Sequence, residues 1–137
     1  MTARYVITGI QNMLDANLKT SATPEDKEAF LFSNDLTIAD GTTNASLTSV
    51  STFGGEKQTL TKANWASATD ADPSVSRYFN TTGMVFDFTG TLAIYGYGIR
   101  GVTSGDLIGA ENFGLKNYLN GQSLELQPFD LKLDIPE

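Results

Sequence analysis

LAIYGYGIRGV, residues 92–102, is the stretch that decides the fold. Its side chains alternate with a period of two, which is the spacing of a β-strand. One face of this strand is expected to carry Ala93, Tyr95, Tyr97 and Ile99, and the other Leu92, Ile94, Gly96 and Gly98. The stretch therefore predicts a long strand with an aromatic face, which is expected to form half of a core, to contact an oligomer partner or to stack sugar rings, in that order of preference.

Further strands are expected on both sides of this one, at residues 84–88, 107–113 and 122–135. Asn120-Gly121, before the last of them, is the strongest hairpin signal in the chain, because both residue types accept positive φ. The alternation of the last strand changes phase near Pro128, which predicts a bulge there. Residues 82–135 together predict a four-strand β-meander.

The N-terminal half gives weaker signals. Apolar residues recur at spacings of three and four over residues 4–19, which predicts one α-helix. Residues 29–65 predict short strands joined by a Ser/Thr/Gly-rich loop, in which residues 45–53 form a weak strand or an extended loop that orders on a partner. The 137 residues suit a single domain. The expected fold is mainly β, an antiparallel β-sandwich or open barrel with a C-terminal meander and one N-terminal α-helix.

Composition narrows the possible partners. The chain has 16 acidic and 9 basic residues and a net charge of −7, which disfavours binding to nucleic acid. No stretch approaches the ~20 apolar residues that span a bilayer, so no membrane contact is expected. The N-terminus does not resemble a signal peptide, and the chain is expected to be made in a cytoplasm.

The residues that catalysis and metal binding most often use are scarce. The chain has no histidine and no cysteine, which removes the commonest general base and the thiolate nucleophile and metal ligand. Asp87, Glu111 and Glu125 could supply a glycosidase pair, but acids on the polar face of a strand are the ordinary interpretation. Asp70-Ala71-Asp72 is interpreted as a solvated turn before Pro73. We therefore expect no catalytic residues, no metal and no enzyme activity.

Gly96 to Gly101 match the G-x-G-x-x-G pattern of dinucleotide-binding loops. That pattern needs a helix to open at its last glycine, whereas here a strand end and a turn are expected. Glycines inside a strand more often mark a bend or close backbone packing. No cofactor is therefore expected.

The C-terminal half resembles a module common in small virion proteins of tailed phages. The similarity lies in residues 92–98, 107–113, 119–126 and 131–135, and more loosely in the first helix. The resemblance implies a virion structural protein, most simply a capsid cement or decoration protein on the outer capsid surface. A tail-tip or fibre-associated module that binds a receptor or carbohydrate is the alternative.

A cement protein implies the major capsid protein as partner and a homo-oligomer on a symmetry axis of the shell. The candidate contact residues are Tyr95 and Tyr97 on the aromatic strand, with Leu47, Val50 and Phe53 in the Ser/Thr/Gly-rich segment. The oligomeric state, the position on the particle and any glycan binding do not follow from the residues.

Overall fold

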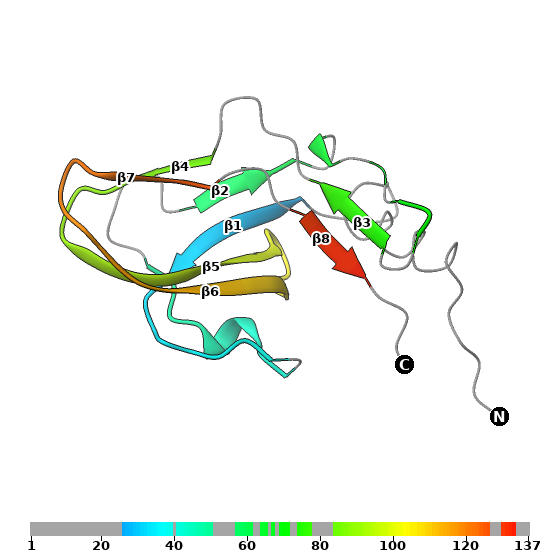
Figure 1. Ribbon diagram of the computed structural model, residues 1–137, viewed down its shortest axis with the longest axis horizontal. Coiled ribbons are helices and arrows are strands. Elements are labelled where there is room, and N and C mark those ends of the chain that lie inside the picture. Colours follow the sequence, from blue (N-terminus) through cyan, green and yellow to red (C-terminus); the bar gives the residue numbers. More distant parts are fainter. Residues whose placement is uncertain are drawn as a thin grey trace.

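The computed structural model describes residues 26–39, 41–50, 57–61, 64–65, 67, 69–71, 74–77, 84–126 and 130–133 (Figure 1). The mainly β, antiparallel class is confirmed. The helix expected over residues 4–19 lies outside the described residues. The elements are β1 (Lys27–Phe32), η1 (Asn44–Ser46), β2 (Lys57–Leu60), β3 (Ser74–Arg77), β4 (Met84–Asp87), β5 (Leu92–Gly101), β6 (Leu107–Tyr118), β7 (Ser123–Leu126) and β8 (Asp130–Leu133).

The central sheet has four antiparallel strands in the order β2-β1-β5-β6. Its second strand, β1, is buried on both faces. Ala29 and Leu31 point into one apolar cluster, whereas Phe30 and Phe32 belong to a second cluster on the opposite face. This accounts for the unbroken apolar run at residues 29–32, because a strand covered on both sides has no polar face to alternate with.

The C-terminal strands form a bent ribbon rather than a meander. β5 pairs with β6, but β4 pairs with β7, so the two pairs continue one another as a single antiparallel ribbon. The ribbon bends where β4 passes into β5 and β6 into β7, and Figure 1 shows the β4/β7 pair lying back over the central sheet.

The prediction of a hairpin at Asn120-Gly121 is therefore wrong. Gly121 does adopt a positive φ of 88°, and the Gln122 amide donates to the Leu119 carbonyl, so a tight turn is present. The Gly121 amide instead donates to the carbonyl of Phe88, across the ribbon. Asn120-Gly121 thus forms the tight turn that its residue types favour, but this turn changes the direction of a ribbon instead of joining two paired strands.

The predicted last strand, residues 122–135, is divided between two sheets. β7 pairs with β4, whereas β8 pairs with β3 in a separate two-stranded sheet. The bulge expected near Pro128 lies outside the described residues.

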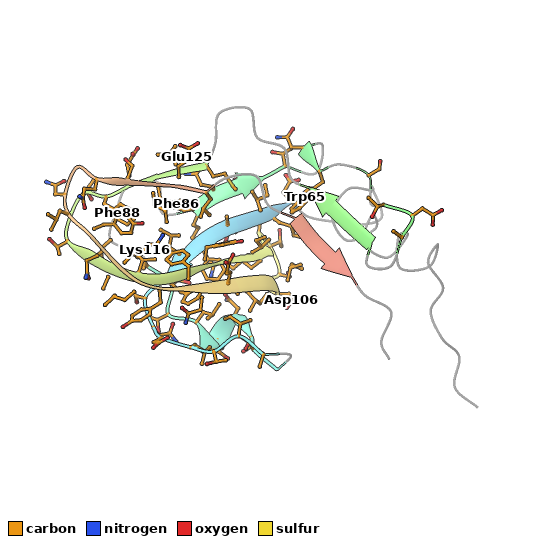
Figure 2. The ribbon with its side chains drawn as sticks, viewed as in Figure 1. Trp65, Phe86, Phe88, Asp106, Lys116 and Glu125 are labelled. Atoms are coloured by element: carbon orange, nitrogen blue, oxygen red, sulfur yellow. The ribbon has the colours of Figure 1, made fainter. Side chains whose placement is uncertain are left out.

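The main core fills the space between the β4/β7 pair and the central sheet. Figure 2 shows Phe86 and Phe88 directed into this space from the upper layer. Each large side chain buried here stabilises the fold by about 1.5–3 kcal/mol. The layers are also joined at one margin, where the Gln58 side chain of β2 donates to the Val85 carbonyl of β4 at 3.0 Å. The core comprises Ala29, Leu31, Val50, Leu60, Trp65, Met84, Phe86, Phe88, Ile94, Ile99 and Leu126.

The opposite face of the central sheet is covered by residues 33–39 and 41–50, which we call the strap (Figure 1, cyan to green, beneath β5 and β6). It encloses the second cluster, formed by Phe30, Phe32 and Leu47. The weak strand expected over 45–53 is not formed in its described part, where the 3-10 turn η1 leads into a single bridge between Ser49 and Phe32. Its apolar residues are too widely spaced for a strand, and instead they anchor a loop.

Candidate functional site

The outer edge of β6 is one of several strand edges without a ladder partner among the described strands, and a groove lies beside it. Among the described strands only β5 pairs with β6, so the other side of β6 has no ladder partner there. An edge of this kind presents a row of N–H and C=O groups that can pair with an added strand. We call residues 107–112 the open edge.

The two halves of β6 differ in how accessible this edge is. Gly114, with φ of 84°, lies in an irregularity where residues 113–115 face the single residue Tyr95 of β5. Beyond it, Lys116 lies with its ammonium 4.8 Å from the centre of the Phe113 ring. A bulge and a lysine are devices that protect edges from pairing. The open edge contains neither lysine nor proline, although it too carries a smaller irregularity, near Ile108.

A groove runs beside the open edge, between it and the strap. One part, of about 260 Å³, is lined by Ile38, Ala39, Thr42 and residues 107–110. A second part, of about 490 Å³, shares Thr42 and Leu107 and continues toward η1 and the β5–β6 turn. The four strand residues Leu107, Ile108, Gly109 and Ala110 are half-buried, so the groove places apolar side chains next to main-chain groups that pair with no other described strand.

The far wall of the groove is held in place by a buried arginine. Arg100 of β5 is only 8% exposed and lies with its guanidinium 4.1 Å from the centre of the Phe30 ring. Its Nε donates to Glu28 at 2.7 Å, and its Nη1 donates to Asn44 at 3.0 Å and to Ser49 at 3.1 Å. One side chain thus ties β1, β5 and the strap together, using the fork of donors that only arginine has.

Two asparagines complete this attachment. Asn34 donates to the Ser46 carbonyl and accepts from the Thr48 amide, which closes the strap on itself. Asn112 of β6 donates to Asp35 at 2.9 Å and to the Leu36 carbonyl at 3.0 Å. The strap is therefore fixed to both β5 and β6, and the groove is a built feature of the fold.

The exposed charges along the open edge are negative. Asp106 precedes it, at the turn labelled in Figure 2, and Glu111 lies within it; both residues are exposed. Glu111 also faces Tyr97 across the ladder. Burial, then the negative charge of Glu111 and the hydrogen bond to it, raises the pKa of Tyr97 from 10.0 to about 12. The Glu111 side chain is thereby oriented by a hydroxyl that stays protonated at neutral pH.

The residues predicted to contact a partner do not form one surface. Tyr95 packs against the second cluster beneath the strap, whereas Tyr97 packs against the main core, so the expectation that both share a face is wrong. The irregular pairing between Ile94 and Gly96 changes the phase of the strand. Leu47 and Val50 are buried, 6% and 8% exposed, and fix the strap. Phe53 lies outside the described residues.

The glycine pattern at residues 96–101 lies within β5, as the strand interpretation predicted. Gly96 and Gly98 are needed for packing, because a Cβ at either position would collide with the ring of Phe32 or Phe30. The acids Asp87 and Glu125 lie on the β4/β7 pair, where Asp87 is opposite Ser123 and Glu125 is opposite Val85. The Asp87 carboxylate accepts a hydrogen bond from the Ser123 hydroxyl at 2.6 Å. Within the described ranges no three acidic residues gather as a metal site.

Sequence reasoning missed both the open edge and Arg100. The signal for the edge was present, since residues 107–113 contain no protective lysine or proline. Arg100 gave no such signal, because a basic residue near a strand end is ordinarily solvated.

Comparison of the chain with models of known families, with characterised proteins and with solved structures found no match. No helix among the described residues is long and apolar enough to cross a membrane.

Proposed function

We propose that the chain is a non-enzymatic virion structural protein, a capsid cement or decoration protein that binds and stabilises the assembled shell from outside. The observation that carries the binding role is the open edge of β6 beside a groove with a fixed wall. The assignment to a virion is supported by the resemblance of residues 92–98, 107–113 and 119–126 to small tailed-phage virion proteins. These residues build the bent ribbon and its edge.

The physical demands of cementing fit such a domain. A cement protein bridges neighbouring capsomers, so many modest contacts add up without one strong site. A main-chain edge gives affinity that depends little on side-chain identity, and the adjacent groove supplies specificity. In this proposal the partner is the major capsid protein, and copies of the chain associate around a symmetry axis of the shell.

The carbohydrate-binding alternative rested on an aromatic platform made by Tyr95 and Tyr97. These rings contact opposite faces of the central sheet, so they offer no common stacking surface. Specific binding on a glycan array would nevertheless restore that alternative.

The test is to remove the protein from purified particles of the virus that encodes it and to heat the stripped shells. We expect stripped shells to release their contents at a lower temperature than intact ones, and re-addition of the protein to restore the original temperature. Electron microscopy of the restored particles should place it on the outer capsid surface. Unchanged heat stability, or density on the tail alone, would contradict the proposal.

A further inference from the structure

The open edge differs from the rest of β6 in being ready for an added strand. Its residues 107–110 are half-buried and line the groove, and the edge contains no lysine or proline. The second half of the same strand carries the wide irregularity at Gly114 and the lysine at 116. The open edge has only the smaller irregularity near Ile108, whereas the wider irregularity and the lysine lie in the second half, so an added strand would be confined to residues 107–112.

The side chains beside this edge define what the added strand must carry. On the strap side the walls of the groove carry the apolar side chains of Ile38, Ala39, Leu107 and Ala110, with the polar Thr42 among them. Successive side chains of a strand point to opposite faces. A segment pairing with β6 would therefore place every second side chain in this groove, against those apolar side chains, and the others on the opposite face.

The opposite face presents one exposed acid, Glu111, which accepts a hydrogen bond from Tyr97 there. The exposed Asp106 lines the end of the groove toward the β5–β6 turn. The whole chain adds a net charge of −7, so a cationic segment is attracted and an anionic one is repelled. The same charge opposes pairing of the open edge with a second copy of this chain, which would bring identical acidic edges together.

We propose that the open edge binds, by strand addition, an extended segment of another protein in which apolar and basic residues alternate. This inference rests on the proposed function, in which that segment belongs to the shell protein. Main-chain hydrogen bonds hold the segment and the groove accepts its apolar side chains, while Glu111 on the opposite face and Asp106 at the end of the groove pair with its basic ones.

The experiment uses the full chain and a synthetic peptide of alternating valine and lysine as the probe. Two control peptides accompany it, one with glutamate in place of lysine and one with a central proline that cannot complete a ladder. We expect saturable binding of the valine–lysine peptide alone, measured by calorimetry. Hydrogen exchange should show slower exchange for the amides of residues 107–112 and no change in β4 or β7.

A matched pair of variants separates a specific edge from general attraction. Asp106→Asn/Glu111→Gln removes the two acids at the edge, and the glutamine still accepts from Tyr97. Asp70→Asn/Glu125→Gln makes the same change in net charge at exposed positions elsewhere. We expect the edge variant to bind the peptide about fivefold more weakly at low salt and the control variant to bind like wild type, since exposed pairs contribute about 0.2–1 kcal/mol each.

Several outcomes would overturn the inference. Equal binding of the glutamate or proline peptide, or equal weakening by both variants, would show that charge alone or another surface is responsible. Concentration-dependent dimers with slowly exchanging amides at residues 107–112 would make a second copy the occupant.

The same variants distinguish this inference from the proposed function. If wild type stabilises stripped shells and the edge variant does so equally well, the shell function stands and the edge assignment fails. If the peptide binds the edge but wild type has no effect on shells, the edge assignment stands and the cement function fails.

Discussion

Gly96→Ala tests whether close packing explains the glycines of β5. A Cβ at this position would collide with the Glu111 carbonyl oxygen and with the Phe32 ring. The carbonyl belongs to the main chain of β6, so it cannot move without disturbing the β5–β6 ladder, and Phe32 is 0% exposed beneath the strap. A single methyl group at this position therefore forces a shift of the sheet or of a buried ring.

The size of the effect follows from two opposing terms. Overpacking in a well-filled core costs about 1–3 kcal/mol, and here the upper half of that range applies because one obstacle is main chain. Replacing glycine in a strand recovers about 0.5–1 kcal/mol by reducing the freedom of the unfolded chain. The free energy of unfolding should fall by about 2 kcal/mol or slightly less.

Urea unfolding followed by far-ultraviolet circular dichroism measures this loss. With a slope of about 2 kcal/mol per molar urea, the midpoint should fall by about 1 M. Gly90→Ala is the matched control, because a Cβ there would meet nothing within 4 Å and the φ of Gly90 is not positive. Equal midpoints for the two variants would refute the packing argument, and would reopen the question of why two glycines stand in this strand.

Two further predictions concern the strap and the ladder beside the open edge. Arg100→Met removes the partner of Glu28 and the donors to Asn44 and Ser49. It should therefore lower the free energy of unfolding by about 3 kcal/mol and speed hydrogen exchange in the strap. Arg100→Lys should lower the free energy of unfolding by less, and unchanged exchange in the strap of Arg100→Met would contradict the anchoring role. For Tyr97, the folded-state pKa of about 12 lies above the ordinary 10.0, so the stability due to this pKa difference is fully present below pH 10.0 and is lost as pH rises through about 12. Tyr97→Phe should make the fall in stability over that window less steep when unfolding is measured at successive pH values, and parallel curves for the two proteins would contradict it.

The strands themselves were predictable from local pattern. The alternation in residues 84–88 and 92–102 and the apolar run at 29–32 correspond to β4, β5 and β1. The alternation of apolar and polar residues shows which side chains can be buried on one face of a strand. A strand can therefore be predicted from it without knowledge of the partner strand. The glycine pattern in β5 was also assigned to a strand for a local reason, since no helix follows it.

Pairing was not predictable in the same way. The turns after β4 and before β7 have the composition of hairpin turns, and a meander is the simplest topology that joins them. Whether a turn joins paired strands or bends a ribbon depends on how the layers stack, and that is decided by the burial of Phe86 and Phe88 between them. The side chains of Tyr95 and Tyr97 were misassigned to one face because the irregularity opposite Tyr95 arises from Gly114, far along the chain.

The sequence by itself determined the class of this protein: a mainly β chain, acidic, without histidine or cysteine, and with a long strand at residues 92–102. These properties depend on residue type and on spacing within one segment. Only the tertiary structure decided that β4 pairs with β7, that Arg100 fixes the strap, and that one half of β6 keeps an open edge beside a groove. Each of these depends on contacts between segments distant in the chain, and local periodicity carries no information about which distant segments meet.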